Sequence, residues 1–231
     1  FRGHAAPGKM KAVTAEQMRW IDRQSAERFG VDSRQLMENA GRAVADLVAG
    51  DFQPCPVLVV AGKGNNAGDG FVAARYLSRK GFKVEVLLLA NPELLSGASA
   101  ANYQLLSNCP VCFHHAQGTE TAQEISSILS PAVLLIDAIW GVGFRGRVEG
   151  FYVSVIQAMN ASGRKIYSID IPSGLHADTG KVCEVAVKAD VTLALGLPKA
   201  GFYLEEGPFY SGDVRIVSIG HPESLLQPFL N

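Results

Sequence analysis

Short apolar runs alternate with helical segments along most of the chain. A β-branched run at 57–60 is followed by similar runs at 84–89, 111–113, 132–136, 165–169, 191–195 and 214–219. Helical spacing of apolar residues occurs between them, at 96–107, 120–129 and 151–161. Because the runs are continuous rather than alternating, we expect strands that are buried on both faces. The pattern predicts an α/β fold, a three-layer αβα sandwich around a mostly parallel central sheet.

Two further helices are expected before the first strand. Thr14-Ala15-Glu16-Gln17 has the form of a capping box and Gly30 supplies a stop, which predicts a helix at about 14–29. Asp32 is placed to cap a second helix. Its apolar residues fall on one face: Leu36, Met37, Ala40, Val44, Leu47 and Val48.

A glycine-rich segment follows the first apolar run. It reads Gly62-Lys63-Gly64-Asn65-Asn66-Ala67-Gly68-Asp69-Gly70, and helical spacing resumes at Phe71, Ala74 and Leu77. Glycine lets the backbone approach a phosphate closely, and the free N–H groups of a helix start favour negative charge. We therefore expect a strand, a phosphate-binding loop and a helix.

The type of phosphate site stays open at this level. Gly62, Gly64 and Ala67 satisfy the dinucleotide pattern, but that pattern also places an acidic residue about 20 positions later, and the next strand ends in Ala90-Asn91. A P-loop is excluded because no Gly-Lys-Ser/Thr closes the turn. A tight turn without ligand is the alternative, although the polar residues of the segment exceed what a turn needs.

Polar residues also follow two later strands. Asp137 comes after the run 132–136, and Asp170 opens the rigid turn Asp170-Ile171-Pro172-Ser173-Gly174 after the run 165–169. Ligands bind beyond the carboxyl ends of parallel strands, so these carboxylates are candidates for function. The loop 141–147 adds glycines and two arginines that can bind phosphate oxygens, unless it is only a solvated surface loop.

Composition narrows the class of protein. The 231 residues fit one domain, and a net charge of −1 gives no basic footprint for nucleic acid or a membrane surface. With no apolar run long enough for a membrane span and no secretory signal, we expect a soluble, cytoplasmic protein. Residues 1–9 precede Met10 without periodicity, and we interpret them as an expression scar before a single domain at 10–231.

The four cysteines form no framework. Cys109 and Cys112 lie near His114 and His115, but all four fall in one short stretch, whereas structural zinc usually takes two well-separated ligand pairs. We interpret them as ordinary residues of a strand and its edge. Free thiols fit a reducing compartment.

Taken together, the motifs resemble those of the NAD(P)H-hydrate epimerase family, the YjeF N-terminal domain. The resemblance covers about 10–222, and Ala67 is its visible departure, at a position where the family commonly has glycine. The motifs that carry it are Leu36-Met37-Glu38-Asn39-Ala40-Gly41, the segment 62–70, Asp137-Ala138-Ile139 with Gly141, Asp170-Ile171-Pro172-Ser173-Gly174, Ala177-Asp178-Thr179-Gly180 and Pro198-Lys199 with Gly201.

The resemblance implies an isomerase with a Rossmann-like fold. Members of the family interconvert the R and S epimers at C6 of hydrated NADH or NADPH (NADHX and NADPHX), so that a dehydratase can restore the cofactor. The implied cofactor is one potassium ion per subunit. The implied partners are NAD(P)H-hydrate dehydratase, sometimes fused to this domain, and a second copy in a homodimer.

Carried over position by position, the resemblance also implies a set of site residues. The potassium ligands fall on Asn66, Asp137 and Ser173, all of which offer hard oxygen donors. Asp170 is the candidate acid and base, and Lys199 is the second candidate. The expected substrate contacts are Asn65, Asn66, Ala67, Gly68, Asp69, Gly141, Val142, Gly143, Phe144, Arg145, Gly146, Arg147 and Asp170.

Two rival functions belong to other classes. An NAD(P)-dependent oxidoreductase would share the phosphate loop, but it would want a ribose-binding acid where Asn91 stands. A non-catalytic dimerising or protein-binding module would share the fold. That module would not need Asn66, Asp137, Asp170 and Ser173.

Overall fold

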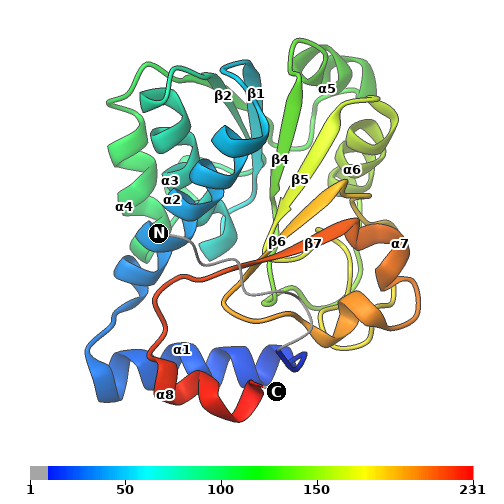
Figure 1. The fold of residues 1–231 in the computed structure, drawn as a ribbon. Helices are drawn as coiled ribbons and strands as arrows, with labels where there is room; N and C mark the ends of the chain where they lie inside the picture. The colour runs from blue at the N-terminus through cyan, green and yellow to red at the C-terminus, as the bar shows by residue number, and fades with distance from the viewer. Residues whose placement is uncertain (1–9, 231) are drawn as a thin grey trace.

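Seven parallel strands form the centre of the molecule (Figure 1). The computed structural model describes residues 10–230, so the scar expected at 1–9 lies outside the described residues. The strand order is β3-β2-β1-β4-β5-β6-β7, which confirms the predicted parallel sheet and its Rossmann-like winding. The strands are β1 (Pro56–Ala61), β2 (Lys83–Leu88), β3 (Cys112–His115), β4 (Leu134–Ala138), β5 (Lys165–Ile169), β6 (Val191–Leu195) and β7 (Asp213–Val217).

Helices cover both faces of the sheet, as the αβα prediction requires (Figure 1). One face is covered by α2 (Ser33–Asp51), α3 (Asn65–Arg79) and α4 (Gly97–Leu106), and the other by α5 (Ala122–Leu129) and α6 (Phe151–Ala161). Successive β1 residues alternate between the two cores, Val59 facing one and Val60 the other. Burial on both faces is the reason for the continuous apolar runs.

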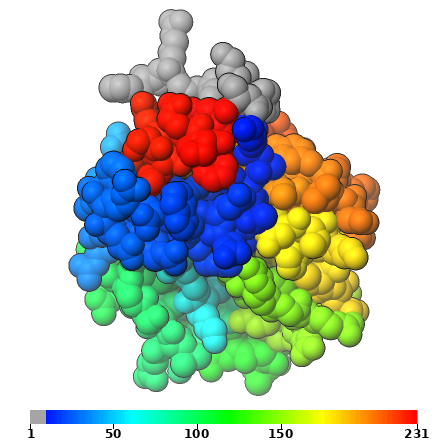
Figure 2. Space-filling model, turned by 90° about the horizontal axis from the view of Figure 1, so that it is seen from below, coloured from blue at the N-terminus to red at the C-terminus, as the bar shows by residue number. Residues whose placement is uncertain are grey.

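Helix α1 (Ala15–Phe29) lies at one end of the sheet, beside α8 (Glu223–Leu226) (Figure 1). The capping box of Thr14 and Gln17 is present, and Gly30 ends the helix at φ 68°. Met18 and Ile21 pack into a small core with Leu226. Figure 2 shows that α1 and the C-terminal segment lie side by side on this end of the molecule.

Several short elements were not expected from the sequence. Stretches of three to five residues show no reliable hydrophobic period, so the pattern along the chain does not reveal them. They are η2 (Pro92–Leu94), η3 (Ala200–Tyr203), α7 (Gly207–Ser211), η4 (Gln227–Phe229) and α8.

The start of α3 corrects one expectation. Helical structure begins at Asn65 rather than near Phe71, because the glycines expected in a loop are helical residues in close packing. A Cβ atom at Gly68 would lie 2.5 Å from the Met37 sulfur, and one at Gly70 would lie 2.6 Å from the Ala138 Cβ. These glycines let α3 approach α2 and β4 closely.

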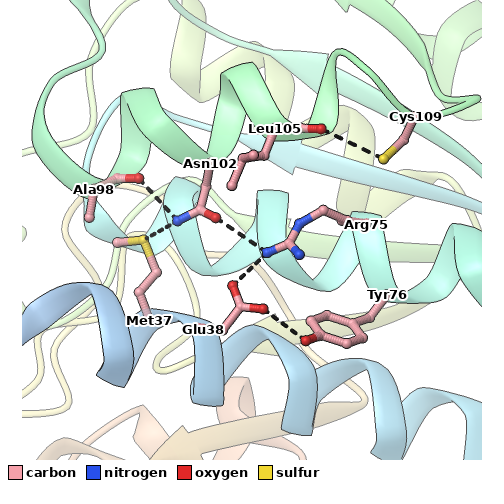
Figure 3. Close-up of polar contacts among 8 residues, drawn as sticks. All are labelled: Met37, Glu38, Arg75, Tyr76, Ala98, Asn102, Leu105 and Cys109. Carbon is pink, nitrogen blue, oxygen red and sulfur yellow. Dashed lines mark hydrogen bonds and ion pairs between the residues drawn. The ribbon is translucent and has the colours of Figure 1, made fainter.

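A polar cluster, buried at Arg75 and Asn102 and partly exposed at Glu38, joins α2, α3 and α4 (Figure 3). Arg75 Nη2 lies 2.5 Å from Glu38 Oε2 and 3.4 Å from Asn102 Oδ1, and the Tyr76 hydroxyl donates to Glu38 Oε1 at 2.8 Å. Burial opposes ionisation of Glu38, but hydrogen bonds from Arg75 and Tyr76 outweigh it and lower the pKa. Asn102 also bonds to Ala98 O. The cluster fixes α3, and therefore its first turn, against its neighbours.

Candidate active site

A cleft of about 960 Å³ opens beside the carboxyl ends of the strands. It lies where the winding reverses, because the chain runs from β1 outward to β2 and β3 and then returns to β4 on the other side of β1. This switch point is where open α/β sheets bind ligands. Residues of α1 and α2, the start of α3 and the loop after β4 line this cleft. Its volume suits a small-molecule ligand.

The first turn of α3 exposes backbone donors to this cleft. Gly64 caps the helix without a side-chain bond, and the first bond of the helical type runs from Gly68 N to Gly64 O at 3.3 Å. The preceding N–H groups, including that of Asn65, therefore have no partner within the helix. Lys63, Gly64 and Asn65 line the cleft. The arrangement suits an anion such as a phosphate.

Asn66 is a buried residue with an unsatisfied side chain. It is 7% exposed, and neither its amide nitrogen nor its oxygen has a hydrogen-bond partner among residues 10–230. Buried polar groups are normally bonded, so this amide marks a place for a ligand. A Cβ atom at Gly141 would lie 3.3 Å from Asn66 Oδ1 and 2.8 Å from Asp170 Oδ2. The first turn of α3 and the loops after β4 and β5 meet so closely at Gly141 that a side chain there would displace them.

Asp137 at the end of β4 and Ser173 in the turn after β5 form a corner in which the carboxylate is fully hydrogen-bonded. Asp137 is completely buried, with Oδ1 accepting from Ser173 Oγ (2.6 Å) and Ile139 N (3.2 Å), and Oδ2 from Ser168 Oγ and Ser173 N (both 2.8 Å). Burial raises the pKa of Asp137, and these hydrogen bonds oppose the shift. Because a carboxylate has about four acceptor positions, the protein fills them all. The corner ties the end of β4 to the turn after β5.

Asp170 forms an ion pair with Lys199 behind the cleft. Asp170 Oδ1 lies 2.5 Å from Lys199 Nζ, and Oδ2 accepts from Val142 N at 3.0 Å. Lys199 is fully buried and also donates to Leu195 O at 2.8 Å. Asp170 has φ 68°, a left-handed conformation that costs a non-glycine residue about 1–3 kcal/mol. The two candidate catalytic residues are thus in direct contact, with Asp170 on the cleft side.

Asp69 faces the same cleft, but no ion pair or hydrogen bond of the described residues stabilises its carboxylate. It is 8% exposed, and no hydrogen bond within residues 10–230 involves its carboxylate. Burial raises its pKa well above the usual range, the negative charges of Asp170 and Asp22 add to the shift, and Lys199 opposes it. Both the burial and the neighbouring negative charges oppose ionisation of this carboxyl group. The sequence predicted Asp69 only as a substrate contact, because burial of a side chain is not visible in a motif.

The loop after β4 brings an aromatic pair and one arginine to the cleft. Trp140 and Phe144 stack at 4.5 Å between ring centroids, and both line the cleft with Arg145. Arg147 is instead paired with Glu184 and does not line it. Gly146, Gly68 and Ala67 are likewise absent from the lining.

Ala67, the departure from the family pattern, is a buried helical residue within the core on the α2–α4 side of the sheet. Its backbone does not need a positive φ, and its methyl group does not face the cleft. The extra methyl group is therefore compatible with the site.

Two arginines of α1 were missed in the sequence. Arg19 and Arg23 line the cleft, and no ion pair among the described residues uses them. Their i, i+4 spacing shows that they share a face of the helix. The sequence does not show that this face turns toward the cleft.

A doubly wound parallel sheet with a ligand cleft at its switch point defines a Rossmann-like α/β protein. The family described as YjeF-related protein N-terminus matches residues 33–201, and the chain belongs to this family.

Relatives extend the match over nearly the whole chain. The bifunctional NAD(P)H-hydrate repair enzyme Nnr of Thermofilum pendens is 40% identical over 219 residues, which cover 94% of this chain and 42% of that protein. The NAD(P)H-hydrate epimerase of Pirellula staleyi is 37% identical over 211 residues, covering 90% of this chain and 92% of that protein. The chain thus spans about two fifths of the bifunctional relative and nearly all of the epimerase.

A solved structure shares the fold. The crystal structure of yeast ynu0 superposes with a TM-score of 0.73, at 24% identity, over 85% of each chain. Within the described part of the chain, no helix combines the length and the apolar content that crossing a bilayer requires.

Proposed function

We propose that the protein is an NAD(P)H-hydrate epimerase, an isomerase that interconverts the R and S epimers at C6 of NADHX and NADPHX. Family membership and the relatives named as epimerases support this activity. The geometric observation that carries it is the placement of Asp69 and Asp170 on one cleft, with Asp170 paired to Lys199. Burial raises the pKa of Asp69 at the same place.

The cleft offers complementary groups to a dinucleotide. The pyrophosphate would meet the free N–H groups at the start of α3, with Lys63 and Arg145 supplying positive charge. Arg19 and Arg23 would meet a further phosphate on the α1 side. The ring of Trp140, which stacks on Phe144 in the lining of the cleft, would offer a flat surface to a base.

The reaction needs a proton at the C6 oxygen. The lone pair of the ring nitrogen expels the C6 hydroxyl as water once that oxygen is protonated, which leaves an iminium that water attacks from either face. A carboxylic acid can give the first proton and take one back from the returning water. Each cycle returns the acid to its starting state and changes only the configuration at C6.

We propose that Asp69 and Asp170 share this proton work. The raised pKa of Asp69 makes it the candidate proton donor, whereas Asp170, which accepts from Lys199 and Val142 N, is the candidate acceptor. Lys199 remains the second candidate because its ammonium group contacts Asp170 directly. Substitutions at these three positions separate the roles.

The residues fit the implied potassium ion in part. The unpaired Asn66 oxygen is a ready donor, whereas the acceptor positions of Asp137 are all filled. The Ser173 hydroxyl, which donates to Asp137, also lies 3.2 Å from Trp140 O. If its hydrogen turned toward Trp140 O, one acceptor position of Asp137 would become free. We propose that Asn66, Asp137 and Ser173 hold K⁺ in this way, where the ion would tie the strand-end loops together.

The wider setting of the activity is also a proposal. The dehydratase that repairs hydrated NAD(P)H would act on the epimer that this protein supplies, and several relatives are named as bifunctional repair enzymes. The homodimer and the cytoplasmic location remain predictions from the sequence.

Two assays test the proposal against its rival. Chromatography of a single purified epimer, with and without the protein, measures interconversion directly. A hydride-transfer assay with unmodified cofactor and a panel of carbonyl compounds tests for an oxidoreductase. Epimerisation without hydride transfer supports the proposal, and hydride transfer without epimerisation would replace it.

A further inference from the structure

Three metal-binding side chains meet at the edge of the sheet, away from the nucleotide cleft. Glu85 of β2 stands opposite Cys112 of β3 in the parallel register, and His114 lies two residues further along the same face of β3. Their potential ligand atoms all lie within 4.8 Å of one another. His114 Nε2 is 2.8 Å from Glu85 Oε2 and 3.9 Å from Cys112 Sγ. None of the three lines the large cleft.

We propose that Glu85, Cys112 and His114 bind one Zn²⁺-class ion, with water at the fourth position. Thiolate, imidazole and carboxylate are the usual donors to zinc, and three protein ligands with one open position make a tetrahedral site. Ideal bond lengths and tetrahedral angles place such donors about 3.3–3.7 Å apart. The observed separations of 2.8 and 3.9 Å fall on either side of this spacing, so small side-chain rotations assemble the site.

The surroundings allow an ion to enter. β3 pairs with β2 alone, so it is an edge strand, and Cys112 is exposed while Glu85 and His114 are partly buried. The positive charge of Lys83 opposes binding of a metal ion, because Lys83 forms an ion pair with Glu85. Its ammonium group lies 3.4 Å from Glu85 Oε1, the oxygen not used by His114, and its side chain is 73% exposed. It can therefore turn into solvent when a metal neutralises the carboxylate.

Two of the three ligands, Cys112 and His114, were considered for zinc from the sequence and set aside, because the third ligand comes from another strand. The cysteine and histidine pairs within 109–115 suggested a ligand set on one segment. The structure separates that set: Cys109 Sγ lies 3.7 Å from Leu105 O, and His115 Nε2 lies 3.2 Å from the Tyr103 hydroxyl on the other face of β3. Cys109 and His115 thus provide matched controls for Cys112 and His114.

The test uses the reduced 231-residue protein and Co²⁺ alone as a spectroscopic probe. Wild-type protein is expected to develop a thiolate-to-cobalt absorption band that saturates at one ion per chain and disappears on addition of Zn²⁺. Cys112→Ser should abolish the band. His114→Ala and Glu85→Gln should weaken Zn²⁺ binding by at least about 100-fold, the upper range for loss of an outer partner, while Cys109→Ser and His115→Ala should bind as wild type does.

A second measurement needs no variant. Zn²⁺ should slow alkylation of Cys112 in the wild-type protein and leave Cys109 as reactive as before, as read by mass spectrometry of the labelled peptides. Absence of a cobalt band in wild type, an undiminished band in Cys112→Ser, or equal loss in Cys109→Ser would overturn the proposal. Unchanged alkylation of Cys112 in saturating Zn²⁺ would overturn it as well.

Discussion

The start of α3 and the corner at the end of β4 differ in how completely their buried polar groups are hydrogen-bonded. At the corner, Asp137 is fully buried and accepts four hydrogen bonds from the protein. In α3, Asn66 is buried with no partner for its amide, and Asp69 has a raised pKa and no hydrogen bond among the described residues. Both regions line or support the same switch point of the sheet.

This difference distinguishes groups that hold the structure in place from groups that bind a ligand or take part in the reaction. An unpaired buried polar group lowers the stability of the empty protein, and such groups persist where a ligand or a reaction uses them. A fully bonded carboxylate instead fixes the geometry of its neighbours. Substitutions in the α3 turn should therefore affect activity more than stability, and substitutions in the Asp137 corner should do the reverse.

The largest effect is expected for Asp170. Asp170→Asn keeps the size of the side chain but cannot exchange a proton as a carboxyl does, so epimerisation above the spontaneous rate should fall by about 10²–10⁴-fold. Initial rates measured by chromatography, with binding of substrate measured separately, check this. If Asp170→Asn stays near full activity while Lys199→Ala loses it, the catalytic role belongs to Lys199.

Asp69→Asn should lose as much activity as Asp170→Asn or less. It should also change how the stability of the protein depends on pH. Because folding raises the pKa of Asp69, this carboxyl stabilises the protein below its unfolded pKa of about 3.9, and the contribution is lost as pH rises through the folded-state pKa. The asparagine side chain of the variant does not ionise, so the variant does not lose this stability as pH rises. At pH 7 it should unfold at a temperature equal to or higher than wild type, and the advantage should shrink in acid.

Calorimetry or circular dichroism between pH 4 and pH 8 measures that difference. The prediction fails if the variant is less stable than wild type at pH 7 and this deficit shrinks in acid. That result would show that Asp69 is ionised and stabilised by its surroundings in the folded protein.

Asp137→Asn tests the opposite side of the comparison. The amide cannot accept all four bonds, and an unsatisfied buried donor costs about 1–3 kcal/mol. Denaturant unfolding should show a loss of this order or more. Wild-type stability in this variant would remove the distinction between the two regions.

Asn66→Ala should remove a response to potassium at little cost in stability. We expect KCl to raise the unfolding temperature of wild type more than NaCl at equal ionic strength, because an ion that binds only the folded state stabilises it. The variant should respond equally to both salts. A potassium response that is unchanged in Asn66→Ala would exclude this residue as a ligand.

The two loop arginines should give the smallest effects. Arg145 lines the cleft, so Arg145→Ala should raise KM with kcat little changed. Arg147→Ala is its matched control, because that arginine is paired with Glu184 outside the lining. Equal changes in both variants, or a loss confined to kcat, would contradict a phosphate-binding role for Arg145.

Continuous apolar runs were enough to predict the sheet, because burial on both faces leaves a simple signal. The sequence pattern was misleading at the start of α3, because the glycines suggested a loop where the helix begins at Asn65. Glycine there reflects close packing against Met37 and Ala138, which depends on chain segments distant in sequence.

The strand-end rule brought Asp137, Asp170 and Ser173 together correctly, since parallel strands end at one edge. It did not reveal the direct pairing of Asp170 with Lys199, nor the wall formed by Arg19 and Arg23. These contacts depend on how α1 and the loop after β6 fold back over the sheet. No local pattern records that arrangement.

Epimerisation itself tests the central claim most directly. A single purified epimer of NADHX or NADPHX is incubated with wild-type protein, with the Asp69→Asn and Asp170→Asn variants, and without protein, and the two epimers are separated by chromatography over time. Wild type is predicted to equilibrate the epimers well above the spontaneous rate, with both variants near that background. Equilibration by wild type no faster than the spontaneous reaction would contradict the account.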